Sequence, residues 1–211
     1  MTGKFISFEG PDGSGKSTQV RLLVEYLSAA GYDIVATREP GGTETAEKIR
    51  KLLLDPLNKK MTNRTEVLLY AASRAQHVEE LIKPALAQGK IVICDRFIDS
   101  TIAYQGFGRN LNLDLLDMVN EVATGGLLPD LTVLLDISPE VGLNRIMDLR
   151  PCSKDRLEQE TVDFHRRVRQ GYLYLAEKYP QRIRIIRAGE SKDRVFKRIR
   201  LLLDHILGKH G

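Results

Sequence analysis

A glycine-rich segment near the start of the chain carries the residues with the clearest chemistry. It reads GPDGSGKST and matches the pattern GxxxxGK[ST], directly after an apolar run and before a segment of helical period. Backbone N–H groups of such a loop bind phosphate oxygens, Lys16 reaches the outer phosphates, and Ser17 suits Mg²⁺. A turn that merely caps a helix is the alternative, which the order of strand, loop and helix disfavours. The predicted nucleoside triphosphate site consists of Gly10, Pro11, Asp12, Gly13, Ser14, Gly15, Lys16, Ser17 and Thr18.

The phosphate loop alone does not identify an activity, because GTPases, motor ATPases and small-molecule kinases all have one. Residues 58–61 read NKKM and so lack the Asp of a guanine-reading NKxD motif, and no DxxG switch follows the loop. The apolar run at 91–94 ends in Asp95-Arg96, whereas motor ATPases usually have Asp-Glu there. An arginine beside the carboxylate on the metal side favours a second anion near Mg²⁺.

Arginines recur where a phosphoryl acceptor would lie. Arg38, Asp95 and Arg96 follow apolar runs whose carboxyl ends would meet beside the phosphate loop. Tyr70 and Arg74 are four residues apart on one helix face, and an aromatic ring beside a guanidinium suits a nucleoside monophosphate. Each feature alone has an ordinary alternative: a core tyrosine with a solvated arginine, an exposed ion pair, or a turn cap. The four histidines show no ligand spacing, and we expect none to be catalytic.

The elements that would position these residues alternate along the chain. Apolar runs rich in β-branched residues predict buried parallel strands at 5–8, 34–37, 91–94, 131–137 and 183–186. Helical periods predict helices at 16–30, 43–54, 65–88, 114–123, 140–149, 158–179 and 194–207. This order predicts an α/β fold with helices on both faces of the sheet. We expect one domain over residues 1–211, with a polar, mobile flap at about 149–157.

Composition narrows the class of protein. The chain has 211 residues, 42% of them hydrophobic, and a net charge of +4, which is ordinary for a folded domain and fits an anionic small ligand at least as well as nucleic acid. It lacks a membrane-length apolar run and a signal peptide, so we expect a cytoplasmic protein without a membrane partner. Cys94 and Cys152 form no metal pattern and are expected to be free thiols.

Several longer motifs together resemble the bacterial thymidylate kinases. They are FEGPDGSGKST, TREPGGT, YAASRAQHV, DRFIDSTIAYQG, PDLTVLLD, PEVGLNR and DRLEQE, and they extend from about residue 5 to the C-terminal helix. The resemblance implies the P-loop nucleoside monophosphate kinase fold, with five parallel strands flanked by helices, and a homodimer. It also implies transfer of the γ-phosphate of ATP to dTMP with Mg²⁺, giving ADP and dTDP.

The resemblance assigns roles at the matching positions. Lys16 and the loop amides would hold the ATP phosphates, Ser17 and Asp95 would lie on the Mg²⁺ side, and Asp12 would contact the acceptor sugar. Arg74 and Arg96, joined by Arg38, would hold the dTMP phosphate. Tyr70 matches the phenylalanine that stacks on thymine. The remaining assignments are Ser100, Thr101 and Gln105 for the base pocket, and Arg145 with the loop 188–191 for adenine.

Two positions depart from the family pattern. Some members have a catalytic arginine inside the phosphate loop, where this chain has Gly13, so it resembles the subclass that supplies cations from the flap. The flap candidates are Arg150, Lys154 and Arg156, and the predicted catalytic set is Lys16, Asp12, Arg96, Arg150 and Arg156. Tyrosine in place of phenylalanine at position 70 preserves stacking and adds a hydroxyl.

Two rival functions remain from the residues. A nucleoside or other nucleotide kinase would share the scaffold, although a nucleoside kinase needs no arginines for an acceptor phosphate. A nucleic-acid-dependent ATPase would need a basic face, and the basic clusters at 166–169 and 197–200 lie on predicted helices where a solvated surface explains them. We therefore expect ATP and dTMP, and not nucleic acid, as partners.

Overall fold

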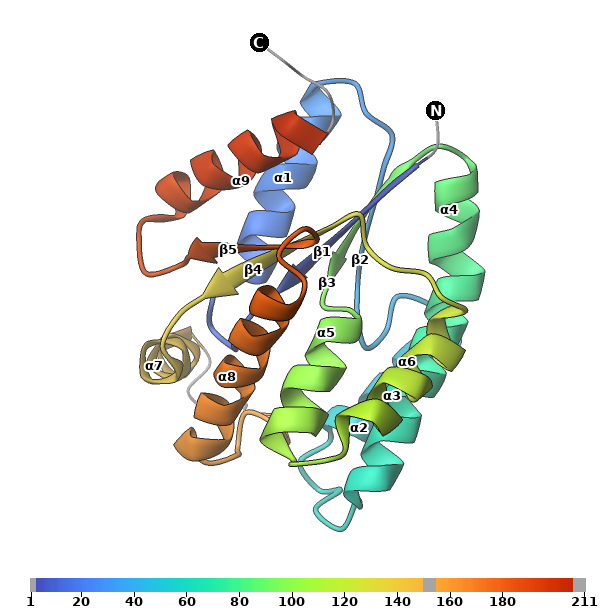
Figure 1. Cartoon of the computed structure of the whole chain (residues 1–211), viewed down its shortest axis with the longest axis vertical. Helices are drawn as coiled ribbons and strands as arrows, with labels where there is room; N and C mark the ends of the chain where they lie inside the picture. Colours follow the sequence, from blue (N-terminus) through green and yellow to red (C-terminus); the bar gives the residue numbers. More distant parts are fainter. Residues whose placement is uncertain (1–2, 150–154, 207–211) are drawn as a thin grey trace.

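Five parallel strands form a single sheet at the centre of the fold (Figure 1). The computed structural model describes residues 3–149 and 155–206. In the sheet the strands run in the order β2-β3-β1-β4-β5. All five predicted strands are confirmed, and their bounds are β1 Lys4–Glu9, β2 Ile34–Arg38, β3 Ile91–Asp95, β4 Leu131–Asp136 and β5 Ile183–Arg187.

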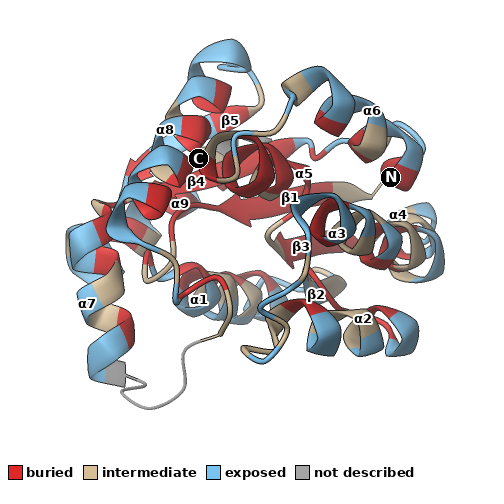
Figure 2. Ribbon diagram, turned by 90° about the horizontal axis from the view of Figure 1, so that it is seen from below, coloured by how far each residue is buried: buried red, intermediate tan, exposed pale blue. Residues whose placement is uncertain are grey.

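Helices cover both faces of this sheet, as predicted. Figure 2 shows the buried strands enclosed by helices whose outer surfaces are exposed. The α-helices are α1 Lys16–Ala29, α2 Glu44–Leu54, α3 Asn63–His77, α4 Lys83–Ala87, α5 Ile98–Thr101, α6 Leu113–Thr124, α7 Pro139–Leu149, α8 Val162–Lys178 and α9 Lys192–Ile206. Two π-helical turns, η1 Val78–Ile82 and η2 Ile102–Gly108, extend α3 and α5.

The hydrophobic core is divided by the sheet. On one face, Leu23 of α1 and Ile199 of α9 pack on apolar side chains of β1, β4 and β5. On the other face, Tyr172 of α8 packs with residues of η2 and β4, while Val78 and Ile82 of η1 pack under β3. Because apolar side chains of the central strands point to both faces, those strands read as continuous apolar runs.

The helix from Ile98 to Gly108 was not predicted. Nearly all of its residues are buried, including polar ones such as Asp99, Thr101 and Gln105. A helix without an exposed polar face lacks the amphipathic period by which helices are found in a sequence. The predicted helix at 158–179 begins four residues later, because Thr161 caps the first turn by accepting a hydrogen bond from the Phe164 N–H.

The predictions for the cysteines and the flap can be compared with the structure only where their residues are described. Cys94 is a free, buried cysteine, whereas Cys152 lies outside the described residues. Of the expected flap at 149–157, Leu149 ends α7 and residues 155–157 are described, whereas 150–154 lie outside the described residues. Within the described ranges, the helices are too short or too polar to cross a membrane.

The phosphate loop packs on the start of α7 through two glycines. Gly13 lies in the left-handed region with φ of 74°, and a Cβ there would collide with the carbonyl of Gly142. A Cβ on Gly142 would in turn collide with the carbonyl oxygen of Asp12. The contacts are between backbone atoms of the phosphate loop and of α7, so rotation of a side chain cannot relieve a clash there.

We expect Gly142→Ala to lower the free energy of unfolding by about 1–3 kcal/mol, because the added methyl group must displace the phosphate loop or α7. Urea unfolding and the Tm measure this. Gly189→Ala is the matched control, since a Cβ at Gly189 meets no atom within 4 Å. Equal stability of the two variants would show that the loop and α7 are not tightly packed.

Candidate active site

The carboxyl ends of β1, β2 and β3 meet at one edge of the sheet. Phe8 and Arg38 are both in register with Asp95, so the residues that follow these strands lie together. In the sheet, β3 lies on one side of β1 and β4 lies on the other, so the strand order reverses at β1. In open α/β sheets, ligands bind in the crevice at the carboxyl ends of the strands where the order reverses. A cavity of about 330 Å³ opens there, lined among others by Asp12, Gly13, Gly15, Lys16, Ser17, Thr18, Arg38, Tyr70, Arg74, Asp95, Arg96, Ser100, Thr101 and Gln105.

Lys16 is held inside the phosphate loop at the first residue of α1. Its Nζ donates hydrogen bonds to the carbonyl oxygens of Gly10 and Pro11, each at 3.0 Å, and its residue is 7% exposed. Burial and, after it, the nearby charge of Arg96 lower the pKa of Lys16 to about 8, against the opposing charges of acidic neighbours. The ammonium therefore pays a desolvation penalty inside the loop, and bound anionic phosphates would offset that penalty.

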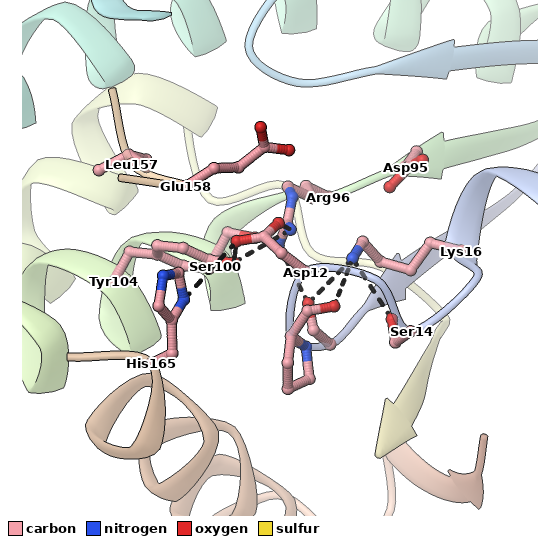
Figure 3. Close-up of polar contacts among 12 residues, drawn as sticks. Asp12, Ser14, Lys16, Asp95, Arg96, Ser100, Tyr104, Leu157, Glu158 and His165 are labelled. Carbon is pink, nitrogen blue, oxygen red and sulfur yellow. Dashed lines mark hydrogen bonds and ion pairs between the residues drawn. The ribbon is translucent and has the colours of Figure 1, made fainter. Parts of the chain in front are cut away.

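Arg96 and Asp12 both line the cavity and form an ion pair with each other (Figure 3). Arg96 has a φ of 73°, and its Nη2 also donates to Tyr104 Oη at 3.1 Å while Nη1 donates to Tyr172 Oη at 2.9 Å. The Tyr104 hydroxyl donates to Asp12 Oδ2 at 2.6 Å. Burial would raise the pKa of Asp12, but Arg96 and Lys16 outweigh it and lower that pKa, so the carboxylate is ionised.

Ser17 and Asp95 are the two side chains whose oxygens were predicted to bind Mg²⁺, and they contact each other. Ser17 Oγ donates to Asp95 Oδ2 at 2.6 Å, as expected for residues that share one ion. Among the described residues, no group of three or more His, Cys, Asp and Glu side chains could hold a metal ion. Mg²⁺ is usually held by only one or two protein oxygens together with substrate phosphates, so a hydroxyl and a carboxylate fit that ion.

Glu9 is a buried carboxylate under the same edge of the sheet. It is fully buried and accepts hydrogen bonds from the Phe97 N–H at 2.7 Å, from Ser100 Oγ at 2.6 Å and from Tyr172 Oη at 2.9 Å. Burial and the charge of Asp99 raise the pKa of Glu9 to about 7, against the opposing charge of Arg96. Ser100, predicted for the base pocket, is thus tied to Glu9 and lies near Arg96.

Arg74 lies deep in the acceptor side and is held mainly by protein groups. Its Nε donates to Glu39 at 2.7 Å, Nη1 to Thr101 and Asn120 at 2.8 and 2.6 Å, and Nη2 to the Phe97 carbonyl at 3.1 Å. Of its five N–H hydrogens, only one remains for a ligand. That single donor fits one hydrogen bond better than the clamp on a phosphate that the sequence suggested.

Arg50 is a cation of the cavity that sequence reasoning missed. It lies on α2, donates to the Pro40 carbonyl at 2.7 Å, and lines the cavity near Arg38. Burial lowers the pKa of Arg50, and the charge of Arg38 lowers it further. Arg38 is more exposed and pairs with Glu47 at 2.9 Å. Two guanidiniums that repel each other at a cavity wall are stabilised by an anion between them.

Tyr70 and Gln105 are both neighbours of Glu66. Both line the cavity, as predicted. Burial raises the pKa of Tyr70, and Glu66 adds to this, so its hydroxyl keeps its proton. Gln105 Nε2 donates to Glu66 Oε1 at 2.9 Å. A phenol that keeps its proton and a side-chain amide therefore both line the cavity.

The flap and adenine predictions have different outcomes. Arg145 Nη1 lies 3.4 Å from the Gly13 carbonyl and 3.3 Å from that of Ala188, so it links the phosphate loop to the loop at 188–191. Arg156 was predicted to be catalytic, but it is not among the residues that line the cavity. Its guanidinium instead pairs with the buried carboxylate of Glu66 at 2.6 Å, and that charge holds it on the acceptor side. Arg150 and Lys154 lie outside the described residues.

Two histidines are buried near the site. His77 shares a hydrogen bond with Thr37 Oγ1 at 2.7 Å and another with Glu39 at 3.0 Å, and so supports the partner of Arg74. His165 Nδ1 lies 4.0 Å from Asp12 Oδ2 (Figure 3). Burial lowers the pKa of His165, in spite of the opposing charge of Asp12. Tyr104 was also missed as a site residue, although it lies within the DRFIDSTIAYQG motif.

Comparison with known proteins gives one consistent result. A family model described as thymidylate kinase matches residues 8–199. A thymidylate kinase of Lactobacillus acidophilus is 52% identical over 94% of this chain and 93% of its own length, and one of a Geobacillus species is 47% identical over 99% and 100%. The crystal structure of thymidylate kinase from Ehrlichia chaffeensis superposes with a TM-score of 0.77 at 38% identity, covering 96% of this chain and 99% of that one.

The depressed pKa of Lys16 predicts how nucleotide binding depends on pH. Bound phosphates favour the charged ammonium and raise its pKa, so binding takes up a proton above pH 8. Between about pH 8 and the pKa of the bound state, affinity for ATP should fall by up to about tenfold per pH unit. Calorimetry from pH 7 to 9.5 measures this. Lys16→Met should bind weakly with no such fall, and a wild-type affinity that stays flat to pH 9.5 would contradict the prediction.

Proposed function

This chain belongs to the thymidylate kinase family, and from that premise we propose that it transfers the γ-phosphate of ATP to dTMP, giving ADP and dTDP. The observation that carries the proposal is a single cavity. Its one side is the phosphate loop with Lys16, and its other side holds Tyr70, Gln105 and a group of arginines. Two anionic nucleotides would therefore meet with their phosphates side by side.

In this mechanism the protein mainly aligns two anions and neutralises them. Phosphoryl transfer passes through a loose transition state whose charge is spread over the equatorial oxygens, so it needs little covalent chemistry from the protein. Lys16 stabilises the outer phosphates of ATP, and Arg96 lies where the acceptor phosphate would approach them. Asp12 holds Arg96 in place and is ionised, so it also accepts a hydrogen bond from a sugar hydroxyl.

The acceptor phosphate is assigned to Arg96, Arg50 and Arg38. The Nη groups of Arg96 are also engaged by protein oxygens, but its side-chain atoms are 17% exposed, against 2% for Arg74, so a phosphate can reach Arg96 more easily. Arg50 and Arg38 repel each other at the same wall. An incoming phosphate stabilises all three cations. Arg74 contributes its single remaining N–H nearer to the base.

Mg²⁺ would be held by Ser17 and Asp95, whose oxygens are 2.6 Å apart. When bound, it neutralises charge on the phosphates of ATP. The other groups then act without a strong general base: Lys16 and Arg96 orient the reacting oxygens, and Asp155, Leu157 and Glu158 help to enclose the cavity.

We also propose a homodimer that uses α3 and α6. These helices pack against each other, and each exposes apolar side chains: Leu68 is 56%, Met118 62% and Val122 85% exposed. Large apolar side chains gathered on neighbouring helices are typical of a surface that another protein covers. A second copy of the chain would also cover Leu115.

The activity is tested by coupled measurement of ADP release, with ATP and Mg²⁺ and one acceptor at a time. We expect fast turnover with dTMP, slower turnover with dUMP, and none with thymidine, AMP or no acceptor, because the arginines need an acceptor phosphate and the inner pocket suits a pyrimidine. Lys16→Ala should lower kcat by at least about a hundredfold while the fold is kept.

Other outcomes would point elsewhere. Turnover with thymidine would show that the arginines do not bind an acceptor phosphate. ADP release without an acceptor, stimulated by oligonucleotides and steeply reduced by salt, would favour a nucleic-acid-dependent ATPase.

The dimer is tested by sedimentation. Wild-type protein should sediment as a dimer at micromolar concentration, and Met118→Glu should raise the dimer dissociation constant at least about tenfold, because a charge would be buried in the interface. Leu201→Glu on α9, where Leu201 is 66% exposed, is the matched control and should remain dimeric. A dimeric Met118→Glu would exclude this surface.

A further inference from the structure

The carboxylate of Glu66 is buried beside the acceptor pocket and is saturated with donors. Glu66 is 1% exposed and lies in the first turn of α3. Its Oε1 accepts from Gln105 Nε2 at 2.9 Å and from Arg109 Nε at 3.3 Å, and its Oε2 accepts from Arg109 Nη2 at 3.3 Å and pairs with Arg156 Nη1 at 2.6 Å. Each oxygen therefore meets two donors, which is the full capacity of a carboxylate.

This environment keeps Glu66 ionised. Burial alone would raise its pKa, but the hydrogen bond from Gln105 and the charges of Arg109 and Arg156 lower it below its ordinary value. An ionised carboxylate only accepts hydrogen bonds. The Gln105 side chain must therefore turn its NH₂ group toward Glu66, because the reverse orientation would set two acceptor oxygens against each other.

The orientation of Gln105 decides what it offers to a ligand. Gln105 is 2% exposed and lines the cavity with Tyr70. With Nε2 engaged by Glu66, the carbonyl Oε1 is left to accept a hydrogen bond, and it has no hydrogen-bond partner among the described residues. Thymine and uracil carry an N–H donor at N3, whereas cytosine carries a lone pair there.

We infer that Glu66 is a positioning residue for base selection: by fixing the amide of Gln105, it makes the pocket accept pyrimidines that donate at N3 and reject cytosine. The inference rests on the proposed function, since it concerns the base of the acceptor nucleotide. A site built to hydrogen-bond one group rejects an analogue that lacks it much more strongly than an apolar pocket does. Glu66 acts through Gln105 and touches no substrate.

The test compares kcat/KM for dTMP and dCMP in three proteins. Wild type should prefer dTMP at least about a hundredfold. Glu66→Gln replaces the carboxylate by an amide that either donates or accepts, so the Gln105 amide is free to reverse and present NH₂ to cytosine N3. The dTMP-to-dCMP ratio should then fall at least about tenfold, mainly through KM, because the phosphate groups are untouched.

Arg109→Gln is the matched control, because it removes another partner of Glu66 but keeps the carboxylate beside Gln105. Its dTMP-to-dCMP ratio should stay close to that of wild type. A folded Glu66→Gln with the wild-type ratio would overturn the inference, and so would a fall of the same size in Arg109→Gln. Wild type that turns over no dTMP would refute the proposed function itself.

A second measurement needs no variant and remains decisive if Glu66→Gln does not fold. Calorimetry on wild type compares dTMP with its N3-methyl derivative, which cannot donate at N3. We expect the derivative to bind at least about tenfold more weakly than dTMP. Equal affinities would show that Gln105 Oε1 accepts no hydrogen bond from N3, and would overturn the inference.

Discussion

The ion pair between Arg96 and Asp12 is the interaction on which the site depends. Arg96 follows β3 and Asp12 lies in the loop after β1, so their contact ties the acceptor side to the phosphate loop. Without the carboxylate, Arg96 and Lys16 would stand as two adjacent cations in a largely buried site, where like charges repel strongly. With it, Arg96 is held in position before a phosphate arrives, so little reorganisation is needed at the moment of reaction.

A similar arrangement recurs near the cavity, where Arg74, Arg109 and Arg156 each pair with a buried carboxylate. Glu39 holds Arg74 and receives His77 on its other oxygen, while Glu66 holds Arg109 and Arg156. Buried ion pairs contribute little net stability, since desolvation offsets much of the attraction. Their value here is geometric, because each guanidinium donates to several acceptors and is thereby fixed in place.

The sequence predicted the fold and many of the residues that line the cavity, for reasons that lie in particular residues. The strands were found because β3 and β4 are continuous apolar runs, and Lys16 was found because its loop has a fixed local pattern. The helix at 98–108 escaped prediction because it is buried on all sides. Arg50 and the pairing of Arg156 with Glu66 were missed because both depend on contacts between residues far apart in the chain, which no local spacing records.

The pairing of Arg156 with Glu66 gives residues 155–158 a structural role in the cavity wall. Its neighbours Asp155 and Leu157 line the cavity. Arg156 itself forms an ion pair with Glu66, and its Nε donates a hydrogen bond to the Leu53 carbonyl oxygen at 2.9 Å. Arg156 therefore anchors this wall of the cavity to Glu66 on the acceptor side. Because Glu66 also orients Gln105, one buried charge fixes both the wall that covers the acceptor and the group that reads its base.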